Sequence, residues 1–307
     1  MSGKRMTLTG LVAAAHTPFD ADGRLNLAAV PAQAEHLLRG GVRAVFVAGS
    51  TGECHSLTVE ERLALVQRWG EVARGTDLRL VVHVGSNCLA DARTLARQAE
   101  AVGAAAVAAL APSYFKPDSV DALAACCAEV AAAAPGLPFY FYDIPALTGV
   151  RLPMPEFLAR AAGRIPTLAG LKFTNPDLMA FQRCLNTEGG RFDVAWGLDE
   201  YLLAALALGA VGAVGSTYNF AAPLYRRLIA AFERGDLTAA RAEQYRSVEL
   251  IGLLAGLGFI PAAKAVMGLL GVDVGPARLP HTNLTAGQHA ALRAGLERLG
   301  FFDWLGA

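Results

Sequence analysis

The strongest constraint on the fold is the alternation of short apolar runs with amphipathic stretches along most of the chain. Eight runs recur at intervals of 19 to 35 residues, at 11–15, 44–47, 79–84, 105–110, 139–142, 168–172, 194–197 and 213–216. Helical patterns follow them, at 27–38, 59–73, 90–101, 120–133, 155–162, 178–185, 200–208 and 224–233. Strands that alternate with helices form parallel sheets, and eight repeats favour closure. We predict an α/β protein with a (β/α)8 TIM barrel; a doubly wound open sheet is the alternative.

The last quarter of the chain lacks further strand patterns. Beyond Glu233 the apolar residues recur with helical spacing only. We therefore predict a catalytic barrel over residues 1–234 and a C-terminal helical segment over 235–307, packed on the barrel or on a neighbouring subunit. A chain of 307 residues is long enough for one such barrel with an extension.

Charge and cysteine content exclude several classes of protein. The 27 basic residues balance 27 acidic ones, so no charge pattern favours nucleic acid or an anionic membrane. The apolar runs are short and interrupted, and we expect no membrane span. The five cysteines, at 54, 88, 126, 127 and 184, contain no CxxC pair, which favours reduced thiols in a cytoplasmic enzyme.

Polar residues interrupt the pattern where five of the predicted strands end. In a barrel these carboxyl ends meet at the face that carries active sites. The polar residues are Gly49-Ser50-Thr51-Gly52-Glu53, Tyr142, Lys172, Asp199 with Glu200, and Ser216 with Thr217. We predict that they share one site.

Lys172 is the most informative of these residues. The chain has four lysines, and Lys172 alone ends an apolar strand-like run. A buried ammonium group is costly, and desolvation lowers its pKa and frees the amine to attack carbonyl carbons. The alternative is a lysine that reaches solvent from the strand end.

Two further segments are consistent with carbonyl chemistry. Strand alternation places Tyr140 and Tyr142 on one face, where the Tyr142 phenol could transfer protons, although a core tyrosine is the simpler interpretation. The turn 49–52 offers backbone N–H groups and the Ser50 and Thr51 hydroxyls to a carboxylate, but glycine-rich turns after strands are common. The histidines are scattered and form no HExxH motif, so we expect no metal and no cofactor.

Taken together, these segments resemble the N-acetylneuraminate lyase and dihydrodipicolinate synthase family over residues 11–279. Gly49-Ser50-Thr51-Gly52-Glu53 resembles its pyruvate-carboxylate loop, Tyr142-Asp143-Ile144-Pro145 its Tyr-x-x-Pro segment, and Gly170-Leu171-Lys172 its Schiff-base signature. The resemblance implies a cofactor-free class I aldolase, usually a homotetramer, with Lys172 as the imine-forming residue. It also implies that Tyr114, in the segment 111–117, reaches a neighbouring subunit's active site.

Two branches of this family differ in their substrates. The synthase branch usually carries an arginine two residues after the proline, where this chain has Leu147. The lyase branch is matched by Thr174, by Gly197-Leu198-Asp199-Glu200 and by Gly215-Ser216-Thr217-Tyr218-Asn219. The resemblance therefore implies reversible cleavage of a sialic acid into pyruvate and N-acetylmannosamine. Thr174, Gly197, Asp199, Glu200 and Ser216 would bind the polyhydroxylated part.

Other functions remain open at this point. Asp143 after the tyrosine and His16 in the first strand depart from the family pattern and would be compatible with a changed substrate. The alternatives are a 2-keto-3-deoxy sugar acid aldolase or dehydratase, dihydrodipicolinate synthase, and a non-catalytic sugar-acid binding protein. The presence of both Lys172 and Tyr142 argues against the last.

Overall fold

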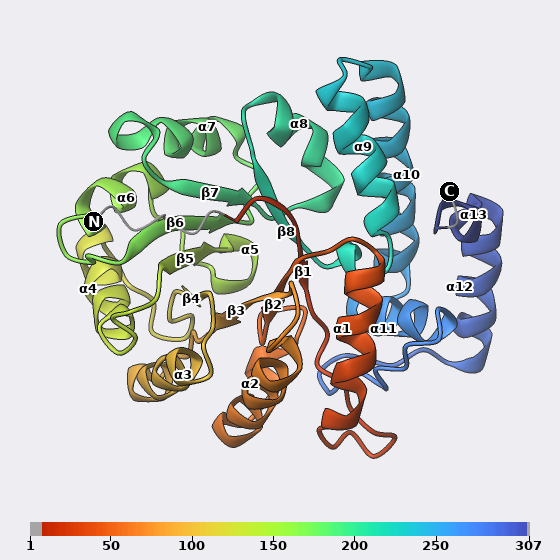
Figure 1. The fold of residues 1–307 in the computed structure, drawn as a ribbon, viewed down its shortest axis with the longest axis horizontal. Helices are drawn as coiled ribbons and strands as arrows, with labels where there is room; N and C mark the ends of the chain where they lie inside the picture. The colour runs from red at the N-terminus through yellow and green to blue at the C-terminus, as the bar shows by residue number, and fades with distance from the viewer. Residues whose placement is uncertain (1–7, 306–307) are drawn as a thin grey trace.

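Each predicted strand pairs in parallel with the next one along the chain, and β1 pairs with β8 to close the sheet. This computed structural model describes residues 8–305 and confirms the predicted barrel (Figure 1). All eight strands lie within one residue of their predicted bounds. They are β1 (Gly10–Ala14), β2 (Ala44–Val47), β3 (Arg79–His83), β4 (Ala106–Leu110), β5 (Phe139–Asp143), β6 (Leu168–Phe173), β7 (Asp193–Trp196) and β8 (Gly212–Gly215).

The helices between the strands surround the barrel (Figure 1). Thr58 begins the second of them with the expected capping box, because its hydroxyl accepts from the Glu61 N–H while the Glu61 carboxylate accepts from the Thr58 N–H. The helices of the barrel are α1 (Val30–Arg39), α2 (Val59–Ala73), α3 (Leu89–Ala101), α4 (Val120–Ala131), α5 (Pro145–Thr148), α6 (Met154–Ala161), α7 (Leu178–Asn186), α8 (Leu202–Ala207) and α9 (Ala222–Glu233).

Two expected helices begin later than their sequence pattern indicated. A 3-10 turn at Leu27–Ala29 precedes α1, and another at Asp199–Tyr201 precedes α8. The prediction of one helix over 200–208 was therefore wrong at its start. The Asp199 carboxylate accepts hydrogen bonds from the loop after β8, and this tertiary contact replaces the first helical turn.

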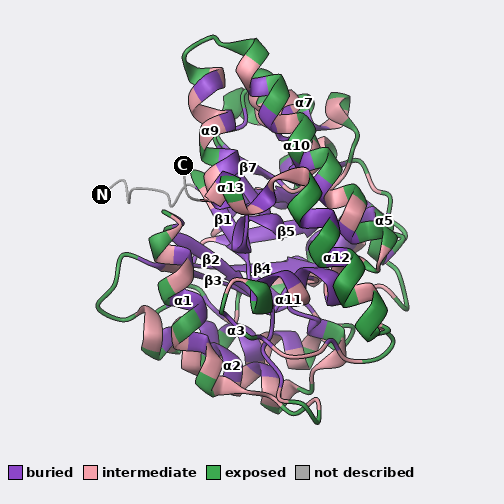
Figure 2. Cartoon of the chain, turned by 90° about the vertical axis from the view of Figure 1, so that its right-hand side faces the viewer, coloured by how far each residue is buried: buried purple, intermediate pink, exposed green. Residues whose placement is uncertain are grey.

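Alternation along the strands separates two apolar cores. Tyr140 and Tyr142 point into the barrel, whereas Phe139 and Phe141 pack outward against the helices. Figure 2 shows the strands as buried and the outer surfaces of the helices as exposed. The predicted facing of the two tyrosines is thus confirmed, and it brings the Tyr142 side chain to the axis of the barrel.

The C-terminal segment consists of α10 (Leu237–Gly256), α11 (Phe259–Leu269), α12 (Ala286–Leu299) and α13 (Phe301–Leu305), beside α1 and α9 (Figure 1). Arg227 on α9 joins it to the barrel by pairing with Glu243 and donating to the Trp304 carbonyl. Within residues 8–305 no single helix meets the length and hydropathy needed to cross a membrane; α10 and α11 meet them only as a pair bent by 112°.

Candidate active site

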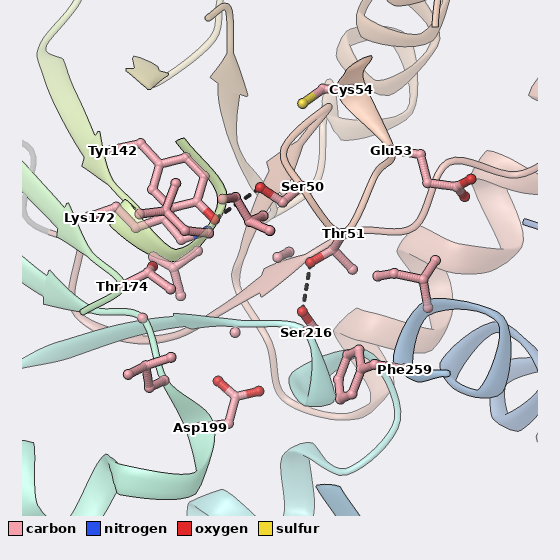
Figure 3. Close-up of a pocket in the computed structure, with 18 of the residues that line it drawn as sticks. Ser50, Thr51, Glu53, Cys54, Tyr142, Lys172, Thr174, Asp199, Ser216 and Phe259 are labelled. Atoms are coloured by element: carbon pink, nitrogen blue, oxygen red, sulfur yellow. Dashed lines mark hydrogen bonds between the residues drawn. The ribbon is translucent and has the colours of Figure 1, made fainter. Parts of the chain in front are cut away.

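A cavity of about 460 Å³ opens at the carboxyl ends of the strands, where the sequence placed the site. Nine of the ten predicted site residues line it: Ser50, Thr51, Tyr142, Lys172, Thr174, Gly197, Asp199, Glu200 and Ser216. They come from β5 and β6 and from the loops that follow β2, β6, β7 and β8. In Figure 3 the side chains of Ser50, Thr51, Tyr142, Lys172, Thr174, Asp199 and Ser216 lie around one space.

Lys172 is buried inside the barrel, with 4% of its surface exposed. Its Nζ lies 3.9 Å from the centroid of the Tyr142 ring and 4.3 Å from that of Phe46. Burial lowers the pKa of Lys172 to about 7, opposed by the negative charge of Asp199. A substantial fraction of the side chain is therefore the free amine near neutral pH, as a carbonyl nucleophile requires. The alternative of a lysine extended into solvent was wrong.

Tyr142 faces Lys172 from the neighbouring strand, because the two residues are paired in register between β5 and β6. Its phenol oxygen lies 3.2 Å from the Ser50 Oγ (Figure 3). Burial raises the pKa of Tyr142, so the resting group is the neutral phenol. The phenol therefore begins as a proton donor. It can accept a proton only after it has given its own proton away.

The loop after β2 reaches across the barrel mouth. The Thr51 hydroxyl lies 2.6 Å from the Ser216 Oγ after β8, and the Thr17 hydroxyl donates to the Gly52 carbonyl at 2.6 Å. These contacts hold the Ser50 and Thr51 hydroxyls toward the cavity. If Lys172 bonds to C2 of a 2-oxo acid, the carboxylate at C1 lies next to this loop. The loop hydroxyls and N–H groups can then donate hydrogen bonds to that carboxylate.

Asp199 is buried, and only one of its two carboxylate oxygens is well hydrogen-bonded. Its Oδ2 accepts from the Thr217 N–H at 2.9 Å and from the Thr217 hydroxyl at 2.6 Å. Its Oδ1 forms no hydrogen bond of good geometry within residues 8–305, and the neighbouring Tyr218 hydroxyl only partly offsets the rise that burial causes in the pKa of the carboxyl. A Cβ at Gly215 would come within 1.8 Å of that oxygen, so glycine is required there. A buried acceptor without a partner is costly, and a substrate hydroxyl could satisfy it.

Thr174 and Glu200 extend the polar wall outward from Asp199. A Cβ at Gly197 would lie 2.0 Å from the Thr174 hydroxyl oxygen, so glycine is required for this close approach. The Thr174 hydroxyl forms no hydrogen bond of good geometry in the described part of the chain, although it lies near enough to the Tyr142 phenol to lower the pKa of that group. Glu200 is half-buried, and burial together with the charge of Asp199 raises the pKa of its carboxyl. The wall thus offers several hydrogen-bonding groups to a polyhydroxylated ligand.

Tyr114 is the predicted site residue that does not line this cavity. It is 79% exposed, packs edge-on against Phe115, and is held by its N–H, which donates to the Asn87 side chain. It follows β4, and its surroundings within one chain are solvent. Its assignment as a catalytic residue therefore depends on a second subunit.

The sequence did not predict the wall that the C-terminal segment contributes. Ile251, Phe259 and Ile260 line the cavity from α10 and α11, together with the His281 side chain. Figure 3 shows Phe259 opposite Tyr142 and Lys172. The sequence marks a break there with Gly256, Gly258 and Pro261, and in the structure Gly258 precedes Phe259 with a positive φ of 88°.

Glu53 lines the cavity, but its carboxylate is engaged by other side chains and is not free for a ligand. Its side chain turns away from Lys172 (Figure 3) and accepts from the buried Lys264 Nζ at 2.8 Å and from the Arg278 N–H at 2.7 Å. Lys264 is a second buried lysine, which the sequence did not identify, but its ammonium is neutralised by Glu53. This buried ion pair joins the loop after β2 to α11.

The two departures from the family pattern lie outside the cavity wall. His16 is buried, and burial lowers its pKa to about 3, so the ring is neutral. Asp143 accepts a hydrogen bond from Asn175 and faces a separate surface depression. Burial raises the pKa of Asp143 to about 6. Neither side chain lines the cavity around Lys172. In residues 8–305 no group of three or more His, Cys, Asp or Glu side chains is placed to hold a metal ion.

A closed parallel barrel with a desolvated lysine facing a phenol at its carboxyl end defines a class I aldolase, a carbon-carbon lyase that forms a Schiff base. Comparison with known proteins gives the same class of enzyme. The model of the dihydrodipicolinate synthetase family matches residues 7–299, and this chain belongs to that family.

Individual relatives match nearly the whole chain. An N-acetylneuraminate lyase of Gallus gallus is 40% identical over 97% of this chain and 98% of its own length. The structure of the Proteus mirabilis N-acetylneuraminate lyase superposes with a TM-score of 0.94 at 42% identity, covering 96% of this chain and 100% of that one. The DHDPS of Cyanidioschyzon merolae gives a TM-score of 0.88 at 30% identity, covering 95% and 98%.

Proposed function

We propose that this enzyme reversibly cleaves N-acetylneuraminate into pyruvate and N-acetylmannosamine. The observation that carries the proposal is the continuity of the cavity from Lys172 and Tyr142 along Thr174, Asp199 and Glu200. A 2-oxo acid bound at the lysine would place its hydroxyls along groups that lack well-formed hydrogen bonds within the described chain. A site built to hydrogen-bond hydroxyls discriminates strongly in their favour. The relatives named as N-acetylneuraminate lyases support the same substrate.

In the proposed reaction Lys172 attacks the C2 ketone of the open-chain sugar acid, and loss of water gives a protonated imine. Tyr142 gives its phenol proton to the hydroxyl that leaves as this water. The resulting phenolate accepts the proton of the C4 hydroxyl, relayed through the substrate carboxylate, while Ser50 and Thr51 hold that carboxylate. The C3–C4 electron pair moves toward the imine, which releases the aldehyde and leaves an enamine. Protonation of the enamine at C3 and hydrolysis return pyruvate and the free lysine.

The entrance of the cavity argues against dihydrodipicolinate synthase activity. Leu147 lines it and is 66% exposed, at the place where the synthase branch carries an arginine. Leucine cannot form the bidentate pair that an arginine makes with a second carboxylate. Asp199 and Glu200 add negative charge on the same wall, and this charge opposes binding of aspartate semialdehyde.

We predict a clear order of substrate preference. The value of kcat/KM for N-acetylneuraminate cleavage, and for condensation of pyruvate with N-acetylmannosamine, should exceed that for condensation with aspartate semialdehyde by about 100-fold or more, since two wall features oppose the semialdehyde. The measurement is a steady-state comparison of these aldehydes with short ones. Greater efficiency with the semialdehyde would contradict the proposal. A preference for short aldehydes would favour a 2-keto-3-deoxy sugar acid aldolase instead.

We propose a homotetramer, as the family resemblance implies, in which Tyr114 approaches the cavity of a neighbouring subunit; Tyr114 and Phe115 are exposed and available for such a contact. Exposed paired aromatic side chains often mark contact surfaces. We expect Tyr114→Ala to shift the sedimentation profile toward smaller species and to lower activity together with it. A wild-type enzyme that is monomeric in sedimentation at assay concentration and fully active would rule out this role.

A further inference from the structure

A histidine that the reaction scheme does not use contacts both the loop after β2 and the Tyr142 ring. His83 is the last residue of β3 and is fully buried. Its ring centroid lies 5.8 Å from that of Tyr142 at an interplanar angle of 89°, and 6.0 Å from that of Phe46. It does not line the cavity, so it meets no substrate.

The hydrogen bonds of this ring determine its tautomer. The Ala48 carbonyl oxygen lies 2.8 Å from Nδ1 and can only accept, so Nδ1 carries the proton. The Leu110 N–H donates to Nε2 at 3.3 Å, so Nε2 is the acceptor. Burial and the nearby Arg62 guanidinium lower the pKa of His83 well below its usual range, which keeps the ring neutral. A neutral ring with this tautomer satisfies both backbone groups.

The carbonyl bound by His83 belongs to an unusual residue. Ala48 has a φ of 56°, in the left-handed region that is unfavourable for a residue with a Cβ. It begins the loop whose Ser50 hydroxyl meets the Tyr142 phenol at 3.2 Å. A residue in this conformation persists only where its surroundings hold it. The Nδ1–H of His83 is the side-chain donor that holds the Ala48 carbonyl.

The packing around the ring leaves little freedom. A Cβ at Gly85 would come 2.8 Å from the His83 Nε2, so the strand end requires glycine for the ring to reach Leu110. The Arg62 guanidinium donates to the carbonyls of His83 and Gly85 at 2.8 and 2.9 Å. Arg62 thus fixes the backbone of His83, and the His83 ring in turn fixes the Ala48 carbonyl.

We propose that His83 is a positioning residue, whose Nδ1–H bond to Ala48 and edge contact with Tyr142 set the geometry of the carboxylate loop against the phenol. The proposal rests on the imine chemistry of this site but not on the identity of the sugar acid. If it holds, losing the Nδ1 donor will impair pyruvate capture more than losing the Nε2 acceptor, although each loss leaves one buried backbone group unsatisfied.

Two substitutions separate these functions of the ring. His83→Asn places an amide donor near the position of Nδ1 and retains the bond to Ala48 but not that to Leu110. His83→Gln places an amide oxygen near Nε2 and retains the bond to Leu110 but not that to Ala48. Leu123→Ala, a buried change on α4 away from the cavity, serves as a control for destabilisation alone.

The readouts are the pyruvate concentration for half-maximal borohydride trapping at Lys172 and the thermal midpoint of each variant. We expect His83→Gln to raise that concentration about tenfold and His83→Asn less than about threefold, at similar thermal midpoints, as one misplaced hydrogen-bonding group implies. Equal effects of both variants, or a larger effect of His83→Asn, would overturn the proposal. Wild-type enzyme that traps pyruvate but fails to cleave N-acetylneuraminate would contradict the proposed function and leave this test valid.

Discussion

Replacing Lys172 with arginine is expected to reduce aldol cleavage by about 10⁴-fold or more, since the nucleophile of a covalent mechanism is lost. Arginine retains the positive charge near Asp199 but stays protonated and forms no imine. Borohydride with pyruvate should leave an adduct on the Lys172 peptide of the wild type and none in the variant. Mass spectrometry of the digest checks both. An adduct on Lys264 or Lys116, or unimpaired cleavage by the variant, would refute the Schiff-base assignment.

The same lysine predicts a pH dependence. Burial lowers the pKa of Lys172 from 10.5 to about 7, so the reactive amine is the minor form below that pH and the major form above it. The rate of pyruvate trapping should rise through pH 7, where about half of the lysine is the free amine, and level off about one pH unit higher. A lysine with its ordinary pKa would instead show a rise that continues toward pH 10. Single-turnover trapping across pH 5–10 distinguishes the two profiles.

Tyr142→Phe is expected to lower kcat by about 10²- to 10⁴-fold, the usual range for loss of general acid-base help. The ring would still pack beside Lys172 and Phe46, so imine formation should be at least partly retained. The experiment compares cleavage kcat with the amount of trapped pyruvate adduct in the same preparation.

Tyr140→Phe is a matched control for this change. Tyr140 also points into the barrel, two residues earlier on β5, but its hydroxyl donates to Asp193 and the side chain lies outside the cavity wall. Its loss should affect stability more than kcat. Equal losses of kcat in both variants would mean that Tyr142 acts only through packing.

Much of the site could be predicted from the sequence because its information is local. A strand end is marked by its apolar run, and parallel strands bring all such ends to one face. Lys172 and Tyr142 needed only this rule to be placed at one face, whereas their pairing in register is seen only in the structure. Leu147 likewise lines the entrance because it closely follows β5.

Contacts between distant segments could not be predicted in this way. Glu53 and Lys264 are 211 positions apart, and neither periodicity nor spacing indicates that they pair. The cavity wall from Ile251 and Phe259 depends on how α10 and α11 dock on the barrel, which a helical pattern leaves undetermined. The late start of α8 has the same origin, since the contact of Asp199 with Thr217 outweighs local helix preference.

The sequence by itself thus determined the order of strands and helices, the face that carries the cavity and the lysine that we propose forms the imine. The tertiary structure decided which polar groups stay unsatisfied and face the substrate. Thr51 and Ser216 meet each other, Glu53 turns to a buried cation, and one Asp199 oxygen is left without a well-formed hydrogen bond in residues 8–305. The reason is physical. Hydrophobic periodicity is a property of residues that are neighbours in the sequence. The hydrogen bonding of a buried polar group depends instead on which atoms the fold brings within about 3 Å of it.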